Sequence, residues 1–129
     1  MAAAESLPNP GDTLVTILAT VEVEDEIYTY EPADNGAGPL WCHGSTIVVR
    51  ANDRVFVAGL ETIAEQVPLN NTRWVLFERE QDGRWHLLHR DLTGCTREPS
   101  PIVLDGDDLL VSANPTLADP GEYGGPAEP

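Results

Sequence analysis

An internal repeat is the feature of this sequence that most restricts its fold. The stretch WCHGSTIVVRANDRVFVAG, Trp41 to Gly59, returns as TREPSPIVLDGDDLLVSAN, Thr96 to Asn114, at an offset of 55 positions. Identical residues recur at that offset in five pairs, namely Ser45 and Ser100, Ile47 and Ile102, Val48 and Val103, Asp53 and Asp108, and Ala58 and Ala113. A unit that occurs twice in 129 residues indicates a repeat architecture with one supersecondary unit in each repeat.

Short apolar runs separated by turn residues predict antiparallel β-strands along most of the chain. The segments AND and QDG supply the Asn, Asp and Gly that short hairpin turns require. No stretch has a convincing helical period, so we expect an all-β protein. The strands of the repeat region are expected at residues 45–50, 54–62, 72–80, 84–92, 100–105 and 109–114.

The residues before the first repeat are expected to add one more strand. From Thr13 to Glu24, apolar side chains alternate with mostly polar ones, which is a strand period, and IYTYE extends the pattern. The apolar set is Ile17, Ala19, Val21 and Val23, and the other set is Thr16, Leu18, Thr20, Glu22 and Glu24. We divide the chain into a flexible arm (1–12), a β region (13–115, with a strand at 13–31, a full unit at 45–92 and a half unit at 100–114) and an irregular tail (116–129).

A four-stranded antiparallel unit of this length is typical of a blade of a β-propeller. In that interpretation, residues 45–50 and 100–105 are the innermost strands of adjacent blades, and their apolar side chains pack between the blades. The alternative is a β-sandwich whose hairpins happen to have similar sequences. Because several identical residues recur at one offset, the sequence favours the propeller unit.

Two pairs of side chains are expected to have defined positions on the strands. Trp74 and Trp85 flank one turn, and we expect them to pack on one face of the sheet. His86 and His89 are three positions apart, which places them on opposite faces and argues against a joint metal site. The acidic run DGDD, Asp105 to Asp108, matches a hairpin turn and lacks the rest of a calcium loop. We therefore predict no metal site and no cofactor.

The composition restricts the kinds of partner. A net charge of −15 repels nucleic acid and anionic membranes, and all seven basic residues are arginines, which favour bidentate contacts with carboxylates. No apolar run is long enough to insert into a membrane, and the N-terminus has no signal-peptide pattern. Cys42 and Cys95 lie at nearly equivalent places in the two repeats, so a disulfide and two separate thiols both stay open.

Three segments resemble the sialidase-like, BNR-repeat β-propeller family: HGSTIVVRANDRVFVAGLE, NNTRWVLFEREQDGRW and TREPSPIVLDGDDLLVSANP. The family's Asp-box, Ser-x-Asp-x-Gly-x-Thr-Trp, lies in the turn between the third and fourth strands of a blade, where this chain has EQDGRW. Asp82, Gly83 and Trp85 match the motif, whereas Glu80 replaces its serine and the tryptophan follows glycine by two residues instead of three. The likeness spans Trp41 to Pro115 and implies antiparallel four-stranded blades of a truncated sialidase-like propeller.

The resemblance implies a fragment or module of a glycoside hydrolase that acts on acidic glycans and is inactive alone. Members of the family are often secreted or periplasmic and have more blades than this chain supplies, so we expect missing blades or self-association. One alternative is a non-catalytic propeller module that binds glycan or protein through its channel rim. Another is a truncated chain without a function of its own.

The resemblance places the catalytic site where two loops, LWCHGS and CTREPS, enter the inner strands. Arg97 would bind a substrate carboxylate, Glu98 would act as a general base or orient a partner, and His43 would serve as an acid, a base or a donor to sugar hydroxyls. The structural alternatives are an exposed Arg97–Glu98 ion pair and a hydrogen-bonded His43 beside a glycine turn.

Three further residues extend this expected rim as substrate-binding positions. Trp41 would stack on a sugar ring, while Asn35 and Asn114 would supply polar groups for a small acidic sugar or a longer glycan. The structural alternatives are core packing for Trp41, an ordinary turn role for Asn35 and a strand end at Asn114.

Overall fold

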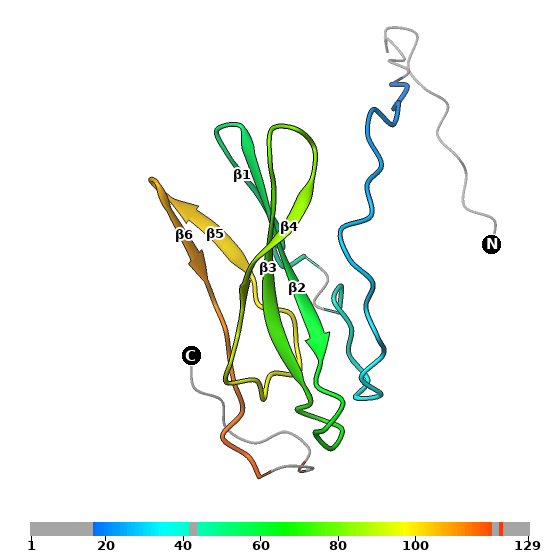
Figure 1. Ribbon diagram of the computed structural model, residues 1–129, viewed down its shortest axis with the longest axis vertical. Coiled ribbons are helices and arrows are strands. Elements are labelled where there is room, and N and C mark those ends of the chain that lie inside the picture. Colours follow the sequence, from blue (N-terminus) through cyan, green and yellow to red (C-terminus); the bar gives the residue numbers. More distant parts are fainter. Residues whose placement is uncertain (1–16, 42–43, 120–121, 123–129) are drawn as a thin grey trace, which may run out of the picture.

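The computed structural model describes residues 17–41, 44–119 and 122, and within them the protein is all-β and antiparallel, as predicted (Figure 1). The strands are β1 (Val48–Ala51), β2 (Arg54–Thr62), β3 (Thr72–Arg79), β4 (Trp85–Arg90), β5 (Ile102–Asp105) and β6 (Asp108–Val111). Strands β1 to β4 form a four-stranded meander, and β5 and β6 form a separate hairpin. No helix among the described residues has the length and apolar character needed to cross a membrane.

The meander falls within the full unit predicted over residues 45–92, and the hairpin falls within the half unit predicted over 100–114. The first hairpin of each unit has a two-residue turn whose first residue has a positive φ, 54° at Asn52 and 61° at Gly106. Asparagine and glycine adopt this conformation more readily than other residues. These turns are 54 positions apart, so the structural repeat is one residue shorter than the offset of the sequence match.

One face of the meander, which we call face A, packs against the β5–β6 hairpin. Phe56, Ala58 and Leu76 are buried there with Ile102 of β5, which is 1% exposed. The backbone N–H of Ile102 also donates to the carbonyl of Thr46 at 2.8 Å, which joins the start of β5 to the segment before β1. Figure 1 shows the hairpin beside β1, with the β1–β2, β3–β4 and β5–β6 turns at the same end of the molecule, which we call the hairpin end.

The opposite face, face B, is covered by the extended residues 25–31. The ring of Tyr28 stacks on that of Phe77 with centroids 4.7 Å apart, and its hydroxyl accepts a hydrogen bond of 3.0 Å from the N–H of Leu60. Nearer the hairpin end, Asp25 accepts a hydrogen bond of 2.8 Å from Nε of Arg79. The meander is therefore covered on both faces by segments that are distant from it in the sequence.

The segment before the meander differs from the expected strand at 13–31. Its described part, residues 17–31, is extended but belongs to no strand, and residues 13–16 lie outside the described part. The apolar side chains of Ile17, Val21 and Val23 are 86%, 78% and 65% exposed. Alternation gives a segment the side-chain pattern of a strand, but a strand forms only where an edge accepts its backbone hydrogen bonds.

A β-bulge between β3 and β4 changes which side chains share a face. The register shifts so that Leu76 pairs with His89 while Phe77 pairs with Leu87. The extra residue on β4 places His86 and His89 on the same face of the sheet. The expectation that they lie on opposite faces was therefore wrong, because it assumed a regular strand.

The two tryptophans beside this bulge lie on opposite faces, and the expectation that they share one was also wrong. Trp74 belongs to face A, where it stacks on His89 with ring centroids 4.7 Å apart. Trp85 belongs to face B, where its indole Nε1–H donates to the carboxylate of Asp25 at 3.3 Å. Each ring therefore helps to hold a different layer.

Gly59 leaves the space that the Tyr28 ring occupies, which yields a first prediction. A Cβ at Gly59 would lie 2.6 Å from the hydroxyl oxygen of Tyr28 and 2.8 Å from Cζ. We expect Gly59→Ala to lower the free energy of unfolding by about 1–3 kcal/mol in urea titrations, since overpacking displaces the ring. In a Tyr28→Ala background the same substitution should have little effect, and equal destabilisation in both backgrounds would contradict the clash.

Candidate functional site

The structure brings two of the predicted rim residues together. Nε of Arg97 donates to the backbone carbonyl of Asn35 at 3.2 Å. Asn35 is 3% exposed, and its Oδ1 accepts the N–H of Ala37 at 2.9 Å, which closes a local turn. These contacts give both residues a structural role, while their roles in substrate binding stay predictions.

The other predicted rim residues are either exposed to solvent or outside the described part of the chain. Trp41 is 48% exposed, so the alternative of core packing does not apply to it. Glu98 and Asn114 are exposed. His43 lies outside the described residues, as does Cys42, and Cys95 is a half-buried free thiol.

A buried polar junction fixes the loop that carries Arg97. Thr72 and Thr96 exchange backbone hydrogen bonds of 3.2 and 3.0 Å, and each hydroxyl also donates to the carbonyl of the other residue, at 2.6 and 3.0 Å. Asn71 Nδ2 donates to the carbonyl of Ala33 at 2.8 Å, which ties the loop after the extended segment to the same place. Sequence reasoning did not single out this junction.

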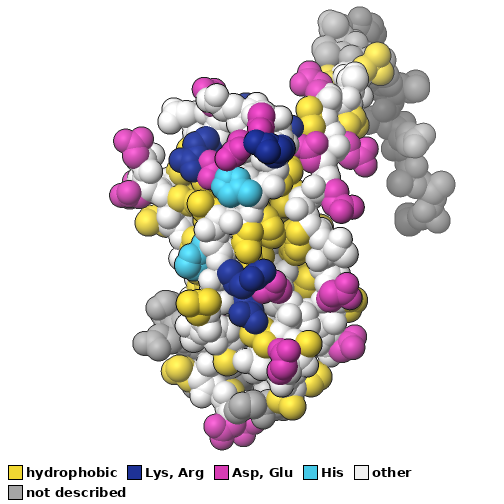
Figure 2. Space-filling model, in the orientation of Figure 1, with side chains coloured by type: hydrophobic (Ala, Val, Ile, Leu, Met, Phe, Trp, Pro, Cys, Tyr) yellow, Lys and Arg dark blue, Asp and Glu magenta, His cyan; other side chains and the backbone are white. Residues whose placement is uncertain are grey.

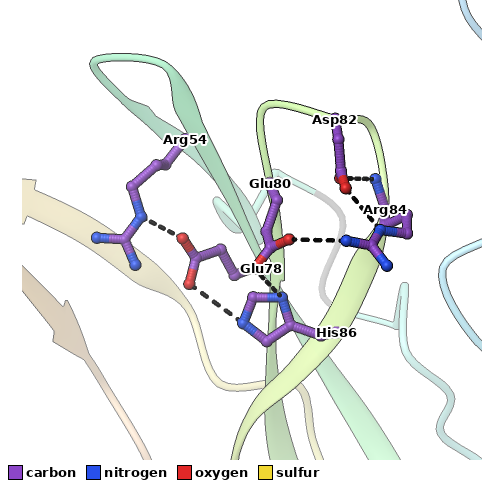
Figure 3. A network of polar contacts seen from close by, with 6 residues as sticks. All are labelled: Arg54, Glu78, Glu80, Asp82, Arg84 and His86. Carbon is purple, nitrogen blue, oxygen red and sulfur yellow. Dashed lines mark hydrogen bonds and ion pairs between the residues drawn. The ribbon is translucent and has the colours of Figure 1, made fainter.

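A network of charged side chains lies at the hairpin end of face A (Figure 3). Its centre is Glu78, whose side chain is 7% exposed and lies between Arg54 and His86. Arg54 donates a hydrogen bond to one carboxylate oxygen, and Nε2 of His86 lies 3.4 Å from the other. The hydrogen bond from Arg54 lowers the pKa of Glu78 and outweighs the opposing effect of burial. A general base works best with a pKa near the working pH. Because the pKa of Glu78 is lowered, this carboxylate is better suited to a stabilising ion pair than to accepting a proton in a reaction.

The β3–β4 turn extends this network outward. Arg84 donates to Asp82 from its backbone N–H at 3.0 Å and from Nε at 2.6 Å. The backbone hydrogen bond is the main reason that the pKa of Asp82 is lowered. A turn that contains Asp two residues before Arg forms these contacts from local geometry, so they do not identify a family. Among the described residues, no group of three or more His, Cys, Asp or Glu side chains has a metal-binding arrangement.

A second candidate site is a cavity of about 420 Å³ on face B, which we call the tyrosine cleft. It lies between the extended residues 28–31 and strands β2, β3 and β4. Tyr28, Tyr30 and Phe77 line it with aromatic rings, and Glu31, Glu61 and Arg90 line it with charge. Its size falls in the range of sites that hold small molecules, which are typically apolar with a few polar groups.

Two arginines share one carboxylate beside the tyrosine cleft. Glu61 accepts Nη2 of Arg90 at 2.9 Å and lies 3.2 Å from Nε of Arg73. This triad carries a net charge of +1 in a chain whose net charge is −15. The side chain of Arg90 is 47% exposed, and Arg90 also lines the tyrosine cleft. Figure 2 shows basic side chains grouped over the sheet with acidic side chains among them, and further acidic side chains around the outline of the molecule.

The hydroxyl groups of the cleft are donors. Burial raises the pKa of Tyr28, so its hydroxyl stays protonated and, while accepting the N–H of Leu60, can still donate its own proton. The hydroxyl oxygen of Tyr30 is buried and has no hydrogen-bond partner among the described residues. A ligand with acceptor oxygens could therefore accept the proton of Tyr28, whereas the hydroxyl of Tyr30 is covered by the protein.

Sequence reasoning missed the tyrosine cleft because its residues are far apart in the chain. Glu61 and Arg73 lie directly opposite each other on β2 and β3, and Arg90 of β4 pairs with Val75, two residues further along β3. Their proximity therefore depends on strand register, and the register of β4 depends on the bulge. The two tyrosines belong to no motif.

Comparisons with known proteins return no match: no family model fits the sequence, and no curated protein or solved structure is significantly similar to it.

The Glu78 network yields a prediction about pH. The pKa of Glu78 is lowered in the folded protein from an ordinary value of 4.5, so its contribution is fully present above that pH and is lost as pH falls through the folded pKa. We expect Glu78→Gln to be less stable than the wild type at pH 7 and to lose less stability on acidification, in thermal unfolding at a series of pH values. Glu65→Gln, which alters an exposed carboxylate outside the network, is the control. Parallel pH curves for Glu78→Gln and the wild type would contradict this assignment.

Proposed function

We propose that this chain is a non-catalytic binding module for glycans that carry a carboxylate, and that it holds the acidic sugar in the tyrosine cleft. The observation that carries the proposal is the Arg73–Glu61–Arg90 triad beside an aromatic cavity. Sugars expose apolar ring faces and many hydroxyls, and an acidic sugar adds one carboxylate. An aromatic cavity with a partly exposed arginine side chain and the hydroxyl of Tyr28 offers a contact for each of these groups.

Each part of the cleft supports a specific contact. Arg90 keeps donors that Glu61 does not use, because a guanidinium group has five N–H donors and the ion pair uses Nη2. The hydroxyl of Tyr28 accepts the N–H of Leu60 and keeps a proton that it can donate to a sugar oxygen. Phe77 and Leu87 supply an apolar surface for the ring carbons. Because Glu61 is already paired with two arginines, it repels a bound carboxylate less than a free glutamate would.

We further propose that the meander and the hairpin are successive blades of a β-propeller, and the arrangement of the sheets supports this. The β5–β6 hairpin packs on face A and repeats the β1–β2 hairpin at 54 positions, as successive blades of a propeller would. The segments leading into β1 and β5 are hydrogen-bonded side by side through Thr46 and Ile102. A channel rim that includes Trp41, Arg97 and Glu98 belongs to the same proposal as a second contact for a longer glycan.

Hydrolysis is less well supported than binding. The sialidase-like reaction uses a tyrosine nucleophile, which has to lose its proton to react. Burial raises the pKa of Tyr28, the cleft tyrosine whose hydroxyl already accepts a backbone N–H, and this disfavours the phenolate. The catalytic roles implied for Arg97, Glu98 and His43 stay predictions.

Titration of the full chain with small sugars tests the proposal. We expect glucuronic acid and N-acetylneuraminic acid to shift amide resonances of residues 28–31 and of Glu61 and Arg90, and neutral glucose to have a much smaller effect. Arg90→Gln should weaken binding of the acidic sugars by about tenfold, because it removes a charge-assisted hydrogen bond. Calorimetry or the same resonance shifts give the dissociation constants.

The matched control is Arg84→Gln, which removes an arginine whose side chain is 79% exposed and pairs with Asp82 at the β3–β4 turn. This variant changes the net charge by the same amount but leaves the cleft intact, so its affinity should equal that of the wild type. Equal loss in the two arginine variants would indicate a general charge effect. Absence of any shift with acidic sugars would rule out the cleft as their site.

A further inference from the structure

The N-terminal arm, which we define as residues 17–24, has the side-chain pattern of a strand without a sheet to join. Ile17, Ala19, Val21 and Val23 would share one face of a strand, and all four are exposed. Large apolar side chains left in water at this density are unusual for a folded chain and mark a surface that binds something. The arm is therefore a candidate interaction segment.

A free strand edge lies on the other side of the molecule. Among the described strands, β6 pairs only with β5. The N–H of Ser112 donates to the carbonyl of Pro101 on the β5 side, so the alternation of an antiparallel ladder turns the N–H groups of Leu109 and Val111 toward the open edge. An open edge of this kind accepts an added strand.

Beside this edge, face A is covered only in part. A groove of about 640 Å³ lies between the hairpin and the meander, with Phe56, Leu76, Leu88, Leu104 and Leu109 among its apolar lining. Leu88 on β4 is 45% exposed, whereas Leu76 on β3 is 6% exposed. A third strand beside β6 would lie over the β3–β4 half of face A and cover this groove.

We propose that the arm of one copy of this chain adds to the β6 edge of a second copy as an antiparallel third strand. Its backbone would pair with the open N–H and C=O groups of β6. The side chains of Ile17, Val21 and Val23 would then pack toward Leu88 and the groove. This inference concerns face A and is independent of the sugar site proposed on face B.

The groove on face A of the same chain is a poor acceptor for the arm. This is why we propose that the arm binds a second copy. Asp25, at the base of the arm, is fixed on face B by Arg79 and by the indole N–H of Trp85. From there the arm runs past the hairpin end and away from the sheet (Figure 1), whereas the groove lies on face A. The run from Glu22 to Glu26 has no Gly, Pro or Asn to reverse the chain over the hairpin end, and the carboxylate of its one Asp, Asp25, is held by Arg79 and Trp85.

The charge of the chain predicts how this association depends on salt. Each copy carries a net charge of −15, so two copies repel each other at low ionic strength. The proposed contact gains its free energy from apolar burial and strand pairing, which salt does not screen. The association should therefore strengthen as salt is added, which is the opposite of an association driven by ion pairs.

Sedimentation equilibrium of the full chain over a range of concentrations and salt tests the proposal. We expect a mass above that of the monomer, and we expect Val21→Asp to weaken association by about tenfold or more, because it places a charge in the apolar contact. Val21 is 78% exposed and belongs to no strand, so this variant should fold like the wild type.

The matched control is Leu18→Asp, which adds the same charge to the arm on the opposite face of the proposed strand; Leu18 is 87% exposed. Its association should equal that of the wild type, and an equal loss in both variants would overturn the proposal. A monomer at all concentrations would also overturn it, and hydrogen exchange would then show whether a protected arm has folded onto its own chain. Val21→Asp should bind acidic sugars like the wild type, so failure of either proposal can be recognised separately.

Discussion

Burial of β2 on both of its faces is the constraint on which the rest of the structure depends. Every residue from Phe56 to Leu60 is buried, and β3 beside it also buries side chains of both orientations. A sheet with one solvent face would alternate between buried and exposed residues. Because this one does not, the meander requires a layer on each side. The β5–β6 hairpin supplies one layer, and the extended residues 25–31 supply the other.

The two covering layers differ in kind, and this difference produces the two candidate surfaces. Face B is covered by a single extended segment held at Tyr28 and Asp25, and one segment cannot fill the width of a four-stranded sheet. The tyrosine cleft is the space that it leaves open. Face A is covered by two strands over a four-stranded sheet, so the outer half of that face keeps a groove. Both surfaces follow from incomplete cover of one doubly apolar sheet.

The sequence predicts the features of this fold that depend on local chemistry. Hairpin strands and their turns were located because apolar runs and Asn, Asp and Gly are adjacent in the chain. The predictions that were wrong, and the contacts that were not predicted, concern features that depend on residues distant in the sequence. The offset of 55 maximised identities such as Ser45 with Ser100, but the turn positions set the structural repeat at 54. The bulge that brings His86 and His89 to one face, and the register that joins Glu61 to Arg90, have no signal in the sequence.

Because the net charge of the chain is strongly negative, only local arginine contacts can favour the binding of an acidic ligand. With a net charge of −15, the chain repels any acidic ligand at a distance, and this long-range field is screened beyond roughly 8 Å at physiological salt. Within that distance the arginines matter most, because Arg54, Arg73, Arg79, Arg84 and Arg90 each pair with a carboxylate that holds the guanidinium group in place. The triad at Glu61 has one more guanidinium than carboxylate, whereas the Glu78 network has more carboxylates than guanidinium groups. An acidic ligand that reaches both regions therefore meets a surplus guanidinium group only at the triad. Because Glu31 also lines the tyrosine cleft, this contact depends on the partly exposed side chain of Arg90 and not on the net charge of the cleft.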